Sequence, residues 1–316
     1  MGITSSPSTP LVSIVVLNYK RLSALEQTLK SVVAQRYPSK EMIVVDNHSE
    51  EDVATVVRRY GANIQLIELE TNVGSCAGRN AGIRAAHGDI VITLDNDVSF
   101  LAPDAVDIVV RLFHEHPEYH VLAFQLRDAE TGQVRLREWC HPKDWRQFAE
   151  KSFATHFFVE GAAAYQRQVF ECAGLFYEPL FIYHEGWDLG LRILDRGYRI
   201  RYTPEVGVRH LMSPEARSSR PYFLFTRNYI WIAYRDYPKW LALKFLAFRL
   251  AMMAYFAART RNLWSFFRGV SAGVLGCRHI ARDPVQSSTL AYIDSLDSER
   301  PSFFRRLARH RTAPQL

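Results

Sequence analysis

The chain has 316 residues, of which 48% are hydrophobic and 23% are charged, which is the composition of a globular protein with material for one large core or two smaller ones. This composition excludes a disordered tail protein, a coiled-coil rod and a disulfide-dense secreted mini-domain. The four cysteines form no CxxC pair, so we expect reduced thiols rather than a zinc ribbon, a thioredoxin-type motif or a disulfide framework.

The net charge of +6 is distributed unequally along the chain. Residues 1–200 contain 20 Lys and Arg against 26 Asp and Glu, whereas residues 201–316 contain 19 against 7. An acidic front half and a basic rear half indicate chemistry in the front and an anionic partner for the rear. Nucleic acid and an anionic membrane surface both meet that description.

The front half alternates between two apolar patterns. Residues 1–10 are rich in Ser, Thr and Pro and lack the charged and apolar regions of a signal peptide, so we expect a flexible leader. Apolar periodicity then predicts strands over residues 12–17, 42–45, 64–69 and 90–94, and helices over residues 22–34, 52–60 and 76–86. Strands that are apolar on both faces and alternate with helices indicate a parallel sheet in an α/β domain.

After residue 100 the pattern becomes mixed. It predicts helices over residues 104–114 and 187–196, and strands over residues 121–126 and 157–165. From about residue 220 the chain turns to long aromatic and apolar stretches with scattered Arg and Lys, so we place a boundary at residues 213–220. The sequence contains no evident internal repeat with a period of 20 to 50 residues, so we do not expect a solenoid.

Polar residues follow several of the predicted strands. Ligands of open α/β sheets bind at the carboxyl ends of the strands. The residues at these ends are Asn18 and Tyr19, Asp46, and Asp95-Asn96-Asp97, and a further loop carries Asn72 and Gly74 ahead of Arg79 and Asn80. Asp95 and Asp97 could converge on Mg²⁺ or Mn²⁺, which prefer oxygen ligands. Alternatively, the triplet starts a turn and caps the helix after Pro103.

Several motifs carry a family resemblance. VSIVVLNYKR, IVVDNHSEE, NVGSCAGRNAGI and DIVITLDNDV occur in that order, followed by VEGAAAYQRQVF and GLFYEPLFIYHEGWDLGLRILDRGYRIRYTPEVGVRH. Over about residues 12–237 the chain resembles the family 2 glycosyltransferases of the GT-A fold, above all rhamnosyltransferase-like members that act on bacterial surface glycans. Several motifs in order are more specific than one short pattern.

The resemblance implies a fold and a division of the chain. The expected fold is α/β: a Rossmann-like, nucleotide-binding mixed sheet flanked by helices, with a C-terminal helical segment. Residues 11–215 would form the catalytic domain, with residues 11–100 binding the nucleotide-sugar and residues 101–215 forming the acceptor and catalytic half. Residues 216–316 would form a basic, aromatic helical region.

The resemblance also assigns donor and metal residues. Asp46 would bind the nucleobase with Asn18 and Tyr19, although Asp46 could instead cap the helix over residues 52–60. The residues near the ribose and diphosphate would be Asn72, Gly74, Arg79, Asn80 and Asp95. Arg79 could instead be a surface arginine. Asp95 and Asp97 match the metal-binding DxD motif, and His210 matches a histidine that completes the metal site in many members.

The catalytic motif departs from the family pattern. The family usually has Glu-Asp, but Gly186 stands here in the place of that Asp. Glu185 is therefore the first candidate for the base and Asp188 the second, unless Asp188 is structural. His184 stays a further candidate, because imidazole is the commonest general base. Gly161, His184 and Trp187 would lie on the acceptor side.

These roles imply a metal-dependent, inverting transfer of one hexosyl or deoxyhexosyl group from a nucleotide-sugar to an acceptor hydroxyl. The cofactor would be Mn²⁺ or Mg²⁺, the carrier UDP or dTDP before GDP, and the acceptor a glycan or a lipid-linked glycan. The QxxRW motif of processive synthases is not found in the sequence. The alternatives are a catalytically impaired nucleotide-sugar-binding module and a sugar nucleotidyltransferase.

The rear of the chain contains a 19-residue apolar stretch, residues 240–258. Lys244 and Arg249 interrupt it, so a membrane span would be costly. Aromatic rings beside cations favour binding at a membrane surface, and a packed helical subdomain or a homodimer contact is the alternative. Arg305, Arg306, Arg309 and Arg311 would serve an anionic surface. No nucleic-acid-binding motif accompanies the charge, so we expect no nucleic-acid partner. Together with the reduced thiols, the basic C-terminal region predicts a cytoplasmic protein that is peripheral at the inner face of the membrane.

Overall fold

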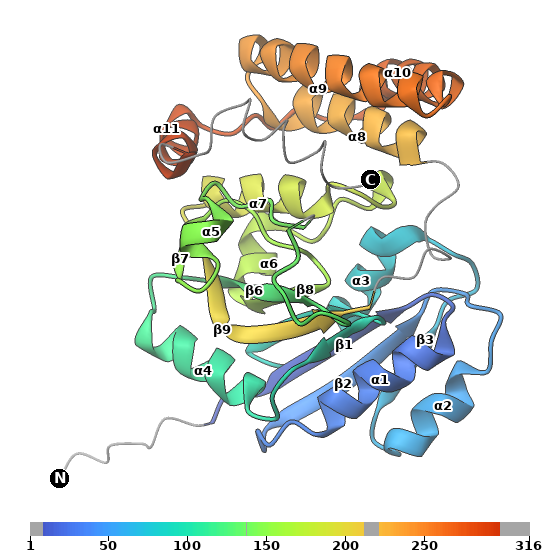
Figure 1. Cartoon of the computed structure of the whole chain (residues 1–316), viewed down its shortest axis with the longest axis vertical. Helices are drawn as coiled ribbons and strands as arrows, with labels where there is room; N and C mark the ends of the chain where they lie inside the picture. The colour runs from blue at the N-terminus through green and yellow to red at the C-terminus, as the bar shows by residue number, and fades with distance from the viewer. Residues whose placement is uncertain (1–8, 137, 212–220, 298–316) are drawn as a thin grey trace.

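The computed structural model describes residues 9–136, 138–211 and 221–297, and within these ranges one mixed sheet of nine strands lies between helices (Figure 1). The strands are β1 (Val12–Asn18), β2 (Lys40–Asp46), β3 (Gln65–Glu68), β4 (Ile90–Asp95), β5 (Val98–Phe100), β6 (Val121–Asp128), β7 (Phe153–Thr155), β8 (Ala162–Gln166) and β9 (Ile200–His210). The helices are α1 (Leu22–Val33), α2 (Val53–Tyr60), α3 (Gly74–Ala85), α4 (Ala105–Glu115), α5 (Trp145–Phe148), α6 (Gln168–Ala173), α7 (Glu185–Asp195), α8 (Pro221–Asp236), α9 (Lys239–Arg259), α10 (Leu263–Gly276) and α11 (Ser287–Leu296), with 3₁₀ turns at Glu178–Leu180 and Cys277–His279.

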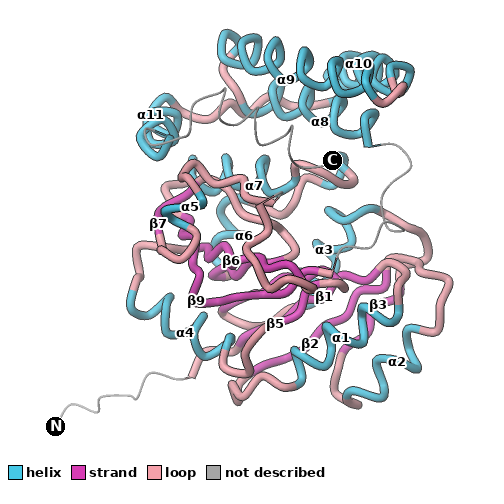
Figure 2. Tube along the Cα trace, in the orientation of Figure 1, coloured by secondary structure: helices cyan, strands magenta, loops and turns pink. Residues whose placement is uncertain are grey.

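The front half confirms the predicted parallel sheet. The strands lie in the order β3-β2-β1-β4, and each neighbouring pair is parallel. The apolar runs are buried on both faces, because Ile14 and Val16 of β1 join one core cluster while Val15 and Leu17 join the other. Helices α1, α2 and α4 cover the first face, and α3, α6 and α7 cover the second, so that the strands run through the middle of the molecule in Figure 2.

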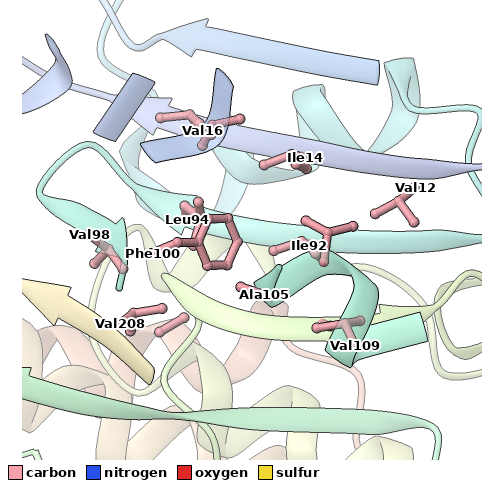
Figure 3. Close-up of a cluster of buried hydrophobic side chains, with 14 of the residues drawn as sticks. Val12, Ile14, Val16, Ile92, Leu94, Val98, Phe100, Ala105, Val109 and Val208 are labelled. Carbon is pink, nitrogen blue, oxygen red and sulfur yellow. The ribbon is translucent and has the colours of Figure 1, made fainter. Parts of the chain in front are cut away.

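Figure 3 shows part of the first cluster. Alternate residues of β1 and β4 point toward the same side of the sheet and meet the ring of Phe100. Val109 of α4 and Val208 of β9 join them there, so the helix after the parallel strands is fixed to the same face as α1.

The second half makes the sheet mixed, as the resemblance implied. β8 pairs antiparallel with both β4 and β6, β6 runs parallel to β9, and β5 and β7 pair antiparallel with β9. The strand predicted over residues 157–165 begins only at Ala162. Phe158 lies in a loop and is fully buried. Its apolar side chain therefore led to the prediction of a strand that begins too early.

The C-terminal helices form a layer at one end of the molecule. α8 lies between α7 and the outer pair α9 and α10 (Figure 1). Residues 213–220, where we placed the domain boundary, lie outside the described residues, as do residues 1–8 of the expected leader and the four C-terminal arginines.

Candidate active site at the sheet edge

The ends of β1, β2 and β4 bring three polar side chains into one buried network. Parallel pairing sets Asn18 directly beside Asp46. The Asn18 amide donates to Asp46 Oδ1 at 2.8 Å, and Asn96 Nδ2 donates to Asn18 Oδ1 at 2.7 Å. Tyr19 follows at the rim of this network and is 37% exposed. The alternative role of Asp46 as a helix cap is wrong, because Asp52 accepts from the first turn of α2.

The loop before α3 is held by its own amides. Asn72 Oδ1 accepts from Gly74 N at 2.9 Å and from Asn47 Nδ2 at 3.2 Å. Gly74 has φ +85°, and a Cβ there would collide with the carbonyl of Phe181. The close approach that Gly74 permits is therefore to the loop at the start of α7.

Asn80 lies one turn further along α3 and faces another loop. Its amide is 1% exposed and donates to Phe176 O and to Glu178 Oε1, while its Oδ1 accepts from Phe176 N. These contacts commit the side chain to holding residues 176–178. The geometry thus favours a structural role for Asn80 over contact with a donor.

Arg79 is the centre of an acidic cluster. It is 2% exposed, so the alternative of a surface arginine is wrong. Nη2 lies 2.6 Å from Asp95 Oδ1, and Nη1 lies 3.8 Å from Glu185 Oε1. Burial would lower the pKa of Arg79, but the carboxylates of Asp95 and Glu185 raise it. The guanidinium therefore stays charged and links the end of β4 to the start of α7.

Glu185 begins α7 and is 4% exposed. Ser75 Oγ of α3 donates to Glu185 Oε1 at 2.5 Å. Burial raises the pKa of Glu185, while Arg79 and Ser75 act in the opposite direction. The carboxylate is held in one orientation, with a basicity above that of an exposed glutamate, as a general base requires.

Glu160 is a second acid in this cluster that the sequence analysis missed. Its carboxylate accepts from the backbone N–H of Gly186, and a Cβ at Gly186 would lie 2.6 Å from Glu160 Oε1. Burial, followed by the charge of Glu185, raises the pKa of Glu160 to about 8. The glycine that departs from the family pattern thus makes room for a carboxylate from another segment. The only sequence signal was an acid directly before Gly161, whose own missing Cβ makes room for Asp95.

Asp188 is placed differently from Glu185, although both belong to the first turn of α7. It is 0% exposed, and Arg192 contacts its Oδ2 through Nη2 at 2.5 Å and Nε at 3.1 Å. Arg235 of α8 donates to Oδ1. Both oxygens therefore serve ion pairs, which favours the structural alternative for Asp188.

His184 and Trp187 face the C-terminal helices. The imidazole stacks on Tyr229 of α8 with ring centres 4.1 Å apart, and burial lowers the pKa of His184 to about 3. Trp187 Nε1 donates to the Tyr237 hydroxyl at 3.0 Å, and its ring lies under the guanidinium of Arg249. The structure does not bring either ring into the cluster around Arg79.

Asp97 and His210 form a pair beside this cluster. Strand β5 pairs antiparallel with β9, which sets His210 at the turn that carries Asp97, and Nε2 lies 3.4 Å from Asp97 Oδ2. Asp97 does not cap α4, whose N-cap residue is Asp104. Arg21 Nη1 also contacts Asp97 Oδ2, at 2.8 Å. Burial would raise the pKa of Asp97, but His210 and Arg21 lower it.

Asp97 and His210 supply an oxygen and a nitrogen ligand for a divalent cation, which is part of a coordination shell. Glu138 Oε2 lies 2.9 Å from His210 Nδ1, an arrangement that fixes Nδ1 and leaves Nε2 toward Asp97. No group of three or more His, Cys, Asp or Glu residues with metal-site geometry occurs in the described residues. Two protein ligands suffice for a cation that keeps water and phosphate oxygens in its remaining positions. Asp95 faces Arg79, so it is not brought into the pair.

Comparison with known proteins gives matches over this same part of the chain. A model of the domain called glycosyl transferase family 2 matches residues 13–174. An uncharacterized glycosyltransferase of Bacillus subtilis, YwdF, is 26% identical over 206 residues, which are 64% of this chain and 74% of that protein. The O-antigen chain rhamnosyltransferase WbaN of Salmonella anatum is 29% identical over 179 residues, which are 54% of this chain and 56% of that protein.

Solved structures match the fold. TarS 1–349 of S. aureus in complex with UDP-GlcNAc has a TM-score of 0.61 at 16% identity, over 91% of this chain and 88% of that one. The mannosyltransferase PcManGT of Pyrobaculum calidifontis, in complex with GDP-Man and Mn²⁺, has a TM-score of 0.57 at 20% identity, over 97% of this chain and 84% of that one.

Proposed function

Since the chain belongs to glycosyl transferase family 2, we propose that this glycosyltransferase moves one sugar at a time from a nucleoside-diphosphate sugar to an acceptor hydroxyl, inverting the anomeric centre. The observation that carries this proposal is the cluster of polar side chains at the strand ends, which lies beside a buried, oriented Glu185. The first could hold a donor, and the second could activate an acceptor.

The donor would lie across the ends of β1, β2 and β4. Asp46 and Asn18 would bind the nucleobase, with Tyr19 beside it at the rim, and Asn72 would lie near the ribose. Arg79 would lie behind Asp95 and pair with its carboxylate, which reduces the repulsion between Asp95 and the diphosphate. UDP and dTDP are the carriers we propose first, with GDP next. The fold neighbours named with UDP-GlcNAc and GDP-Man support a nucleotide-sugar of one of these kinds.

Asp97 and His210 would hold Mn²⁺ or Mg²⁺, with Glu138 fixing the imidazole. When bound there, the cation supplies positive charge against the charge that develops on the departing diphosphate. Neighbours whose structures contain Mn²⁺ support divalent metal use. Arg21 contacts the same Asp97 oxygen, so it would have to release that oxygen on loading.

Glu185 would take the proton from the acceptor hydroxyl. Ser75 orients the carboxylate, and Arg79 keeps a positive charge near it. Glu160 has a pKa raised to about 8, so at neutral pH it holds a proton and places no second negative charge beside Glu185. Asp188 would have no part in the proton transfer, because Arg192 and Arg235 occupy its oxygens.

The acceptor would be a growing glycan or a lipid-linked glycan of a bacterial cell surface. The name of the Salmonella relative, an O-antigen rhamnosyltransferase, supports a hexosyl or deoxyhexosyl transfer of this kind. Transfer would be non-processive and would take place on the cytoplasmic side, at the inner face of the membrane.

Thermal melting of the purified chain with nucleoside diphosphates and nucleotide-sugars, in Mn²⁺, Mg²⁺ or EDTA, tests the donor site. Ligand at about a hundred times its dissociation constant stabilises a protein by about 2.7 kcal/mol. We expect one nucleotide to raise the melting temperature only with the cation, and Asp97→Ala to abolish the shift. No shift with any nucleotide would overturn the proposal. A shift without nucleoside diphosphate release from any donor would favour the binding module instead.

A further inference from the structure

The outer pair of C-terminal helices, α9 and α10, exposes large apolar side chains along both helices. On α9 the exposed residues recur at helical spacing, and Trp240 and Leu243 are 67% and 72% exposed. On α10 the same holds for Trp264 and Phe267, at 74% and 57%. In Figure 1 both helices lie on the far side of α8 from the sheet. We call this surface the outer helical face; its large apolar members are Trp240, Leu243, Phe248, Tyr255, Leu263, Trp264, Phe267, Val274 and Leu275.

The charges around the outer helical face are all of one sign. Residues 237–282 contain eight Lys and Arg residues and no Asp or Glu. Six of the eight are exposed: Lys239, Lys244, Arg259, Arg261, Arg268 and Arg278. Exposed Trp and Tyr rings beside cations match the interface of an anionic bilayer, where the rings enter the headgroup region and the cations meet phosphate.

The inner side of α9 argues against a membrane span. By length and composition α9 could cross a bilayer, and it is the one helix of the described residues that could. Yet Phe245 packs on Trp187 of α7 with ring centres 5.4 Å apart, and Met253 and Ala257 are buried in the helical layer. Arg249 lies over the rings of Trp187 and Tyr229. A helix bound to the folded domain along one side lies in the plane of an interface.

We propose that the outer helical face binds the surface of an anionic lipid bilayer, with α9 and α10 lying flat in the headgroup region. A second copy of the chain is a poorer occupant, because a symmetric contact through this face would bring two sets of cations together without an acid between them. The inference does not depend on the proposed reaction, since the face lies outside the cluster around Arg79.

Cosedimentation with lipid vesicles tests this. We expect the full chain to pellet with equimolar phosphatidylcholine–phosphatidylglycerol vesicles and to bind pure phosphatidylcholine at least about tenfold more weakly. Leu243→Ser with Trp264→Ser should weaken binding to the anionic vesicles at least about tenfold. The matched control is Val33→Ser with Leu101→Ser, two exposed apolar residues outside the C-terminal helices, and it should bind as the wild type does.

A second variant tests the charges. Lys244→Gln with Arg268→Gln keeps every apolar residue of the face and should also weaken binding to the anionic vesicles. If the serine variant has a melting temperature well below that of the wild type, the glutamine variant tests the proposal in its place. Absence of pelleting, or unchanged binding by a folded serine variant, would overturn the proposal. The proposal would also be overturned if the wild-type chain formed a dimer, the serine substitutions dissociated that dimer, and the chain did not bind vesicles. In that case a second copy of the chain would cover the outer helical face.

Discussion

The sheet edge and the C-terminal layer use charge in opposite ways. At the sheet edge Arg79 is buried among three carboxyl groups, and each charge has a partner of opposite sign. On the outer helical face the cations are exposed and no acid lies among them. Paired buried charges fix a geometry that suits a small ligand, whereas unpaired exposed charges suit an extended anionic surface.

Helix α8 joins the two regions. Asn228 is fully buried, and its Nδ2 donates to the carbonyls of Leu180, Ile182 and Tyr183. These carbonyls belong to the loop that leads into Glu185, and Tyr183 stacks on Phe225 with ring centres 4.3 Å apart. The C-terminal layer therefore positions the loop before Glu185, besides exposing its outer face.

The largest effect on turnover should come from Glu185→Gln. Removing a general base lowers the rate about 10²–10⁴-fold, while the amide keeps the size of the side chain and its contact with Ser75. Nucleoside diphosphate release from the donor found by melting is the readout. Glu178→Gln, which breaks an exposed ion pair with Arg84 but keeps an amide oxygen that can accept from Asn80, is the control and should keep its activity. Retention of near-wild-type turnover in Glu185→Gln would place the base elsewhere.

Asp188→Asn should show the reverse pattern. Loss of the charge removes the carboxylate partner of Arg192 and leaves Arg235 with Asp236 alone, and breaking a buried pair costs about 3–5 kcal/mol. Urea unfolding measures this loss, and Glu178→Gln should cost less than about 1 kcal/mol. If Asp188→Asn unfolds like the wild type but fails to turn over, Asp188 takes part in the chemistry.

Asn228→Leu breaks the link between the two regions. The Leu180 carbonyl keeps Arg227 Nη2 as a donor, and each of the other two carbonyls that loses its donor costs about 1–3 kcal/mol. The freed loop should lower kcat about tenfold with little change in the melting shift that the nucleotide-sugar causes. Thr226→Val is the matched control on the same helix, because Thr226 is buried and its hydroxyl has no hydrogen-bond partner among the described residues. A stability loss without any change in kcat would make Asn228 purely structural.

The last effect is the pH dependence that Glu160 contributes to folding stability. Its pKa rises from 4.5 to about 8 on folding, so between these pH values the unfolded chain releases a proton that the folded chain keeps. The contribution of Glu160 to folding stability therefore falls as pH rises through this window. Relative to the wild type, Glu160→Gln should gain stability with rising pH up to about pH 8 and stay level above it. Denaturant unfolding across that range checks this, and a constant difference would contradict it.

The parallel strands could be predicted because their apolar runs are buried on both faces of the sheet. The same reasoning placed Asn18, Asp46 and Asp97 at one edge, since parallel strands end together. It could not find Glu138, which meets His210 from 72 residues away, or Arg21, which meets Asp97 from 76 residues away. Contacts between residues this far apart in the chain depend on the tertiary fold, so no short-range pattern in the sequence reveals them.

The catalytic motif shows the same limit. From the sequence, Gly186 indicates that an acid of the motif is missing. A sequence motif describes only residues that are neighbours along the chain, so it could not show that Glu160 lies beside Gly186. In the fold, Gly186 N–H binds Glu160, which belongs to the segment before β8. Likewise, Asp188 could not be separated from Glu185 by spacing, because its partner Arg235 lies 47 residues away on α8.

The most direct test of the account is the configuration of the sugar that the enzyme releases. With water as the acceptor, ¹H NMR in the first minutes of donor hydrolysis reports the anomer before mutarotation. Direct attack on the donor by an oxygen that Glu185 deprotonates predicts the anomer opposite to that of the donor, and no signal in Glu185→Gln. Release of the same anomer as the donor's would contradict a single displacement and, with it, the role assigned to Glu185.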